Sequence, residues 1–184
     1  MQSPADLGSR RDTIARTWDL PRGVVLIPAG LSVPVPGTDQ YHEFHAHPEF
    51  TYLAGTSPRG AVLGFDPADG WALFVPVPSL EDRVWAGEGE DLDALRQSTG
   101  LRVRPLAELR SWLELRRGEP FALLGNDDIA HHSSGYGLES WPALELDVDD
   151  ALSARLSGLV AESRRAKDAS ELSLMRAAAD ASRA

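Results

Sequence analysis

The sequence predicts an α/β fold in which helices flank a mixed β-sheet, and three observations lead to this prediction. Apolar runs without alternation, at residues 24–27 and 121–124, are typical of strands that are buried on both faces. Two further apolar runs, at residues 61–65 and 72–77, flank a turn sequence and predict an antiparallel hairpin. Segments of helical period lie before, between and after these runs, and this alternation favours helices packed in layers on a sheet.

The first helix is expected to begin at Ser9, a typical N-cap residue, with Asp12 three positions later as its capping-box partner. Ile14 and Trp18 lie four residues apart and therefore share one face of this helix. The helix is expected to end at residues 20–23, just before the first buried strand.

Residues 39–55 form the stretch around which we expect the chain to be organised. A loop rich in proline and glycine, residues 28–37, leads into it. A short apolar strand is expected at residues 52–54, and Gly55 ends it in a backbone conformation that a residue with a Cβ would resist. The residues of this stretch that are expected to anchor the core are Phe50, Tyr52 and Leu53.

The hairpin turn is expected at residues 66–70, which contain the turn dipeptides Asp-Pro and Asp-Gly. Pro76 and Pro78 mark the point at which strand pairing must stop or reach a sheet edge. A short helix at residues 92–97 is expected to end near Gly100.

The next helix is expected to start at Pro105, because proline is favoured at the first helical position. Its apolar face has Trp112 beside it, and Gly118 ends it. The leucines of this face are Leu106, Leu109 and Leu113. After the second buried strand, residues 125–145 show no regular pattern.

Two helices are expected at the C-terminal end. The first begins at about Asp149, and cations at residues 164–167 suit the helix dipole at its end. Its apolar face consists of Leu152, Leu156, Leu159 and Val160. Asp168 and Glu171 form a capping box for the second helix, which has no sequence signal that ends it. Its apolar side consists of Leu172, Met175 and Ala179.

Length and composition describe a soluble globular protein of one domain, or of one domain with a short connection. The chain has 184 residues, of which 42% are hydrophobic and 25% are charged. Its net charge of -10 disfavours binding to nucleic acid and to anionic membranes. There is no cysteine, no stretch of signal-peptide type and no apolar run long enough to span a bilayer, so we expect a cytoplasmic protein.

Three of the five histidines lie close together, and they are the first candidates for a metal site. His45 and His47 would project to one face of an extended chain, and His42 with Glu43 or Glu49 would complete a ligand set. The alternative is that they are loop histidines that form hydrogen bonds with backbone or water. Ligand spacing alone is weak evidence, so we expect no metal here.

Other patterns of catalytic residues are weaker. The sequence contains no nucleophile motif, and Ser133 and Ser134 adjoin His131 and His132 only in sequence. The acidic residues within 87–90 would repel a phosphate from this glycine-rich segment. The acid pairs at residues 127–128 and 149–150 are expected to be solvated surface or helix caps rather than general acids and bases.

The aromatic stretch resembles the N-terminal domain of the aminopeptidase P, prolidase and creatinase family. The matching framework consists of Tyr41, Phe44, Phe50, Tyr52, Leu53 and Gly55. His45 and Ala46 stand where the family has an Arg-Gln pair, and Thr51 and Ala54 also depart from its pattern. A role of that Arg-Gln pair therefore cannot be transferred to this chain.

Two further segments extend the resemblance. Residues 84–87, Val-Trp-Ala-Gly, are similar to a W-x-G that follows the third strand region in aminopeptidase P. By physical chemistry alone, Trp85 is a core or interface aromatic, whereas the resemblance implies that it packs on substrate in the active site of a neighbouring subunit. The third match runs from Arg165 through Lys167 and Glu171 to Met175 and Arg176, and resembles the passage into the family's catalytic domain.

The resemblance implies a creatinase-like, ribonuclease H-like N-terminal domain over residues 1–163 and a connecting segment over residues 164–184. It implies no cofactor and no catalytic residue in this chain. The two divalent metal ions of the family would lie in a C-terminal pita-bread domain that the expected fragment lacks. The implied partners are that catalytic domain and other copies of the chain. The alternatives are a stand-alone binding module, or a whole enzyme that acts as prolidase or creatinase.

Overall fold

A computed structural model describes residues 3–86, 88–125 and 147–183. In these ranges five strands form one sheet in the order β4-β3-β2-β1-β5. The strands are β1 (Val24–Pro28), β2 (Val62–Asp66), β3 (Gly70–Val75), β4 (Arg102–Pro105) and β5 (Phe121–Leu123). β2 pairs antiparallel with β1 and β3, whereas the outer strands β5 and β4 pair parallel to β1 and β3. The predicted α/β fold with a mixed sheet is confirmed.

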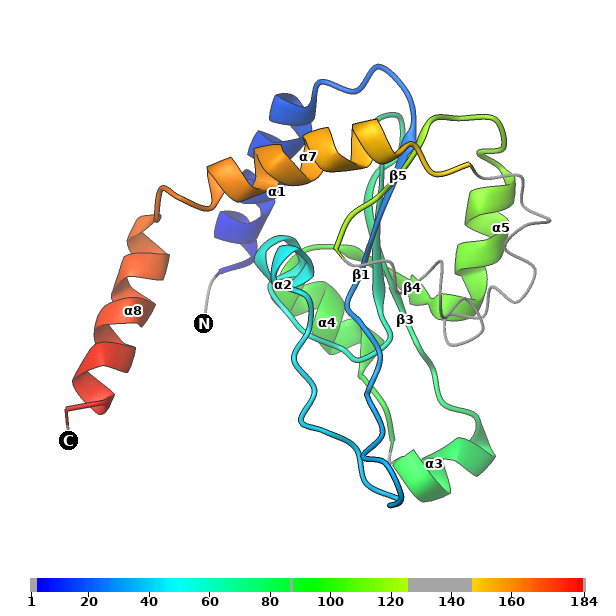
Figure 1. The fold of residues 1–184 in the computed structure, drawn as a ribbon, viewed down its shortest axis with the longest axis vertical. Helices are drawn as coiled ribbons and strands as arrows, with labels where there is room; N and C mark the ends of the chain where they lie inside the picture. Colours follow the sequence, from blue (N-terminus) through cyan, green and yellow to red (C-terminus); the bar gives the residue numbers. More distant parts are fainter. Residues whose placement is uncertain (1–2, 87, 126–146, 184) are drawn as a thin grey trace.

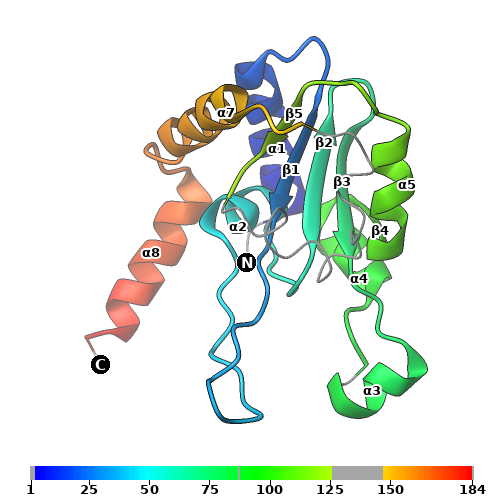
Figure 2. The same ribbon diagram turned by 45° about the vertical axis from the view of Figure 1, so that its right-hand side comes forward.

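Helices cover both faces of this sheet (Figures 1 and 2). The helices α1, α2, α4 and α7 contribute to the core on one face, and α5 to the core on the other. The helical segments are α1 (Pro4–Trp18), α2 (Pro48–Ala54), α3 (Leu80–Ala86), α4 (Leu92–Thr99), the 3-10 turn η1 (Leu106–Glu108), α5 (Leu109–Glu114), α7 (Asp150–Ser163) and α8 (Ala169–Ala181). None of the helices in the described ranges is long and apolar enough to reach across a membrane.

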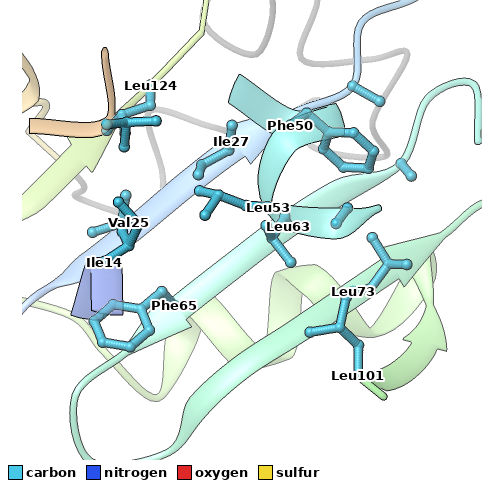
Figure 3. Close-up of a cluster of buried hydrophobic side chains, with 14 of the residues drawn as sticks. Ile14, Val25, Ile27, Phe50, Leu53, Leu63, Phe65, Leu73, Leu101 and Leu124 are labelled. Carbon is cyan, nitrogen blue, oxygen red and sulfur yellow. The ribbon is translucent and has the colours of Figure 1, made fainter. Parts of the chain in front are cut away.

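The position of β1 inside the sheet, between β2 and β5, explains why its sequence lacks alternation. Val25 and Ile27 belong to the core on one face of the sheet, and Val24 and Leu26 belong to the core on the other. Both faces of a strand that lies under helices on each side must be apolar. Figure 3 shows the larger core, in which side chains of the strands meet Ile14 of α1 and residues of α2.

The predicted start of the first helix was wrong. α1 begins at Pro4, and Ser3 is its N-cap, with Asp6 completing the capping box. Ser9 lies inside the helix. A serine followed by a proline at the first helical position is the stronger start signal, because proline fixes the helical φ and lacks an N–H that would be unpaired there.

The predicted strand at residues 52–54 was also wrong, because this segment is the end of helix α2. Pro48 occupies its first turn, and Gly55 follows its last residue with a φ of 70°. Phe50 and Leu53, three residues apart, are both fully buried, which is the spacing of a helix face. Their expected role as core anchors is confirmed, whereas Tyr52 packs against that core only partly buried. The positive φ expected of Gly55 is confirmed as well.

Pro105 does not begin a helix. It is the last residue of the edge strand β4, and the helical turn starts at Leu106. No sequence signal pointed to β4, because its short Arg-Val-Arg-Pro run has only Val103 as a buried apolar residue. Pairing with β3 along a parallel register holds this polar segment in the sheet.

One further boundary was wrong: the helix expected to end at Gly118 ends at Glu114, and Gly118 lies in the turn after it. The other expected elements are confirmed where they lie within the described residues. The hairpin of β2 and β3 closes over residues 66–70, and β3 ends directly before Pro76. α4 ends at Gly100, α7 begins after its N-cap Asp149, and Asp168 with Glu171 forms the capping box of α8. Most of residues 125–145, for which the sequence predicted no regular element, lies outside the described residues.

Candidate functional site

Two parts of the molecule lie at the margin of the layered core. The first is the projecting end, which we define as residues 31–45 and 77–86. Both segments extend past the end of the sheet at which β1 and β3 finish, as the cyan-blue loop and the green α3 of Figures 1 and 2 show. The second is the α7–α8 junction, which we define as residues 163–171 together with Arg10 and Tyr52.

Trp85 lies on the short helix α3 of the projecting end. Pro76 and Pro78 precede this helix and carry it away from the sheet, because a proline cannot donate a ladder hydrogen bond. The side chain of Trp85 is outside the described part of the structure. The apolar side chains of Leu80 and Val84, on the same helix, are 81% and 77% exposed. α3 thus presents apolar side chains to the surroundings, which is typical of a contact surface.

The histidines of the projecting end and of the chain just after it hold their loop by backbone hydrogen bonds. The amide of His42 donates to the carbonyl oxygen of Val33 at 2.9 Å, and the amide of His47 donates to that of Ala29 at 2.9 Å. His45 is exposed, and its Nε2 lies 3.8 Å from a carboxylate oxygen of Glu43. His45 and His47 line a cavity of about 600 Å³ together with residues 29–34.

Glu49 does not turn towards these histidines. It is buried, and its carboxylate accepts hydrogen bonds from the backbone amide of Gly125 at 3.0 Å and from the hydroxyl of Ser157. This carboxylate therefore ties α2 to the end of β5 and to α7. Within residues 3–86, 88–125 and 147–183 no cluster of three or more histidine or acidic residues could hold a metal ion.

Most of the weaker sequence candidates cannot be placed. Gly87, the acid pair 127–128, the histidines 131–132 and the serines 133–134 lie outside the described residues. The acid pair at 149–150 is placed, and there Asp149 caps α7 by accepting a hydrogen bond from the amide of Leu152 at 2.8 Å. The expectation that this pair caps a helix is confirmed.

Arg10 is the centre of the α7–α8 junction. Its guanidinium donates to the carbonyl oxygen of Tyr52 at 2.9 Å and to the Asp168 carboxylate at 2.8 Å, and it lies 3.5 Å from the Glu171 carboxylate. It also lies over the ring of Tyr52, 4.2 Å from the ring centre. The Glu171 backbone amide and Arg10 lower the pKa of Asp168 to about 2, since both stabilise its charged form.

Arg11, next to Arg10, is a second cation that the sequence analysis did not place in the interior. It is buried and donates to the carbonyl oxygens of Leu53 at 3.1 Å and Thr99 at 2.6 Å, which joins α1 to α2 and α4. Burial lowers the pKa of Arg11 to about 10. One signal could have found it: Arg11 lies three and seven residues before Ile14 and Trp18, so it belongs to the inner face of the helix.

One family model and several solved structures match this chain. The family model described as "Aminopeptidase P, N-terminal domain" matches residues 8–120. The comparison with curated proteins gave no match.

Several solved structures are similar in fold. The Pseudomonas aeruginosa aminopeptidase PepP matches with 17% identity and a TM-score of 0.57, over 73% of this chain and 32% of that protein. A Bacillus anthracis protein provisionally named aminopeptidase P matches with 14% identity and a TM-score of 0.62, over 86% and 40%. The low-pH form of Escherichia coli aminopeptidase P matches with 20% identity and a TM-score of 0.56, over 82% and 36%. The chain therefore spans well under half the length of these three proteins.

Proposed function

Because the chain belongs to the aminopeptidase P N-terminal domain family, we propose that it is the non-catalytic N-terminal domain of an Xaa-Pro aminopeptidase. The whole enzyme would hydrolyse the bond between an N-terminal residue and proline with metal-activated water. This domain would contribute to subunit contacts and would shape the mouth of the substrate pocket. The match of residues 8–120 to the family model is the observation that carries the proposal.

The two divalent metal ions of such an enzyme do not fit the described residues of this chain. Those ranges hold no cluster of three or more ligating side chains, and Glu49 is already bonded to Gly125 and Ser157. We therefore assign the metal ions to the catalytic domain of the whole enzyme, and we assign binding and positioning to this chain.

The projecting end supports a role in subunit contact. Leu80 and Val84 are exposed on α3, and Val33 and Tyr41 are exposed on the loop segment of the same end. Apolar side chains that gather on one end of a monomer commonly mark a protein interface. Trp85 lies among them in the sequence, and an indole is a frequent anchor of such interfaces.

Helix α8 supports a contact with a catalytic domain. Among its residues Leu172, Leu174 and Met175 are 39%, 47% and 56% exposed. A helix of 13 residues is marginally stable in water unless an apolar face is covered. The proposed partner domain would cover this face.

The chain is proposed to act in the cytoplasm, and its net charge of -10 disfavours contact with nucleic acid and anionic membranes.

The test of this function is Trp85→Ala in the full-length enzyme that contains the domain. We expect kcat/KM for Xaa-Pro peptides to fall roughly ten- to hundredfold, which corresponds to the loss of a contact worth about 1–3 kcal/mol. Leu115→Ala is the matched control, since Leu115 is 85% exposed but lies beyond α5, away from the projecting end. It is expected to leave kcat/KM unchanged. Full activity of the Trp85 variant, or unfolding of its isolated domain, would contradict the proposal.

Two alternatives remain testable. A stand-alone binding module would be favoured if the reading frame stops after Ala184, whereas a continuation with spaced Asp, Asp, His, Glu and Glu ligands supports the enzyme. A parent that acts as prolidase or creatinase is distinguished by its substrate, since it would cleave dipeptides or creatine rather than longer Xaa-Pro peptides.

A further inference from the structure

Helix α8 is attached to the rest of the domain by few interactions. None of its 13 residues is buried, and it extends away from the sheet beyond α7 and α2 (Figures 1 and 2). Leu174 and Met175 line one side of a shallow groove whose other side contains Pro48 and Tyr52 of α2. Since packing is sparse, the direction of α8 must depend on the contacts at its first turn.

Arg10 supplies contacts at that turn. Its side chain is 7% exposed, although both of its carboxylate partners belong to the first turn of a surface helix. The planar guanidinium binds the carbonyl oxygen of Tyr52 through one nitrogen and the Asp168 carboxylate through another. A guanidinium can hold two partners at a fixed angle, which a single ammonium group cannot do.

Asp168 and Glu171, the two acids that face Arg10, also form the capping box of α8. The Asp168 carboxylate accepts from the Glu171 amide at 2.8 Å, and the Glu171 carboxylate accepts from the Asp168 amide at 3.0 Å. Arg10 therefore binds groups whose positions are already fixed relative to the axis of α8. Tyr52 lies against this cluster, with Arg10 4.2 Å from its ring centre and Arg164 5.9 Å from it.

We infer that Arg10 is a positioning residue that fixes the direction in which α8 leaves the domain, by binding α2 and the capping box of α8 at the same time. This inference goes beyond the proposed function, because it concerns the geometry of this chain whether or not a catalytic domain follows it. In an enzyme of the proposed type, that geometry would decide where the attached domain lies relative to Trp85.

The absence of cysteine from the chain makes a direct test possible. Spin labels are placed on the exposed positions Thr17→Cys in α1 and Ala177→Cys in α8 of the full chain, and the distance between them is measured by pulsed electron paramagnetic resonance. With Arg10 present we expect a single narrow distance. With Arg10→Met we expect loss of the narrow distance and a broad distribution, while the melting midpoint of the domain serves as a separate measure of folding.

Arg16→Met is the matched control, since Arg16 lies on the same helix and its guanidinium donates to the hydroxyl of Thr13 within that helix. It is expected to keep the narrow distance. A narrow distance in folded Arg10→Met, or a broad one with Arg10 present, would overturn the inference.

If Arg10→Met does not fold, a second variant tests the positioning role of Arg10. Asp168→Asn combined with Glu171→Gln removes both charges that face Arg10 but keeps side chains able to form the capping box. We expect this pair to broaden the distance distribution with the helix content retained. An unchanged narrow distance in this folded double variant would refute the role of Arg10.

Discussion

At the scale of single residues, two constraints require a glycine at position 55: its positive φ and the close approach of Leu7. Its φ of 70° is disfavoured for a residue with a side chain, and a Cβ there would lie 2.3 Å from a methyl carbon of Leu7. Leu7 is fully buried, so it cannot move away without displacing other groups. α1 and α2 can therefore approach each other at this point only because residue 55 is a glycine.

Gly55→Ala is expected to lower the free energy of unfolding by about 1–2 kcal/mol through its left-handed backbone and by about 1–3 kcal/mol more through overpacking. Gly37→Ala is the matched control, because Gly37 has a similar φ of 76° but no atom within 4 Å of the position that a Cβ would occupy. Urea denaturation measures both. Equal losses in the two variants would show that Leu7 yields to the methyl group and that the contact is unimportant.

The two buried arginines, Arg10 and Arg11, show which residues are difficult to recognise from sequence alone. Arg10 and Arg11 look like surface charges, since a charged residue is seldom fully buried unless it is paired. Their partners are backbone carbonyls of α2, for Arg11 also the carbonyl of Thr99 in α4, and for Arg10 acids more than 150 positions along the chain. No local sequence pattern predicts hydrogen-bond partners that lie so far along the chain. The capping box at Asp168 was predictable because both of its members lie within four residues of each other.

At the scale of elements, substitutions in and near helix α2 test how much the aromatic stretch contributes to stability. Phe50→Ala is expected to lower the free energy of unfolding by about 3–5 kcal/mol, because its ring is fully buried between α2 and the sheet (Figure 3). Tyr41→Ala, at an exposed position of the same stretch, is expected to change it by less than about 0.5 kcal/mol. If the denaturation midpoint of Phe50→Ala equals that of the unchanged protein, its assignment to the core is wrong.

The elements also show how far sequence reasoning reaches. β1, the hairpin and α7 were predictable, because their apolar residues repeat with the period of one structure and clear turn or cap signals bound them. α2 was not, because a short apolar run fits a strand and a helix equally well and only Pro48 favours the helix. β4 owes its conformation to its pairing with β3, which is information that lies outside its own four residues.

At the scale of the whole molecule, the exposed apolar side chains that we assign to function lie outside the two cores. The projecting end and α8 contribute exposed apolar side chains, whereas the sheet and its covering helices hold the buried ones. Substitutions in the first set can therefore change binding without unfolding the domain. A family motif in the sequence singles out Trp85, and its role in a site stays a prediction, whereas the exposure of Leu80 and Val84 and the course of α3 depend on the assembled fold.

The last prediction concerns metal and the stability of the whole chain. Apolar cores on both faces of the sheet give this domain a source of stability other than a metal ion, and its described residues offer no cluster of three ligands. A structural metal contributes its binding free energy to folding, so chelation lowers the melting temperature of a domain that depends on one. We expect EDTA to leave the melting temperature of the 184-residue chain unchanged.

We also expect that the chain, supplied with divalent metal, releases no N-terminal residue from an Xaa-Pro peptide, since that reaction needs a bound metal ion and a general base. A stoichiometric zinc ion whose removal lowers the melting temperature would contradict the first of these expectations, and metal-dependent hydrolysis by the isolated chain would contradict the second.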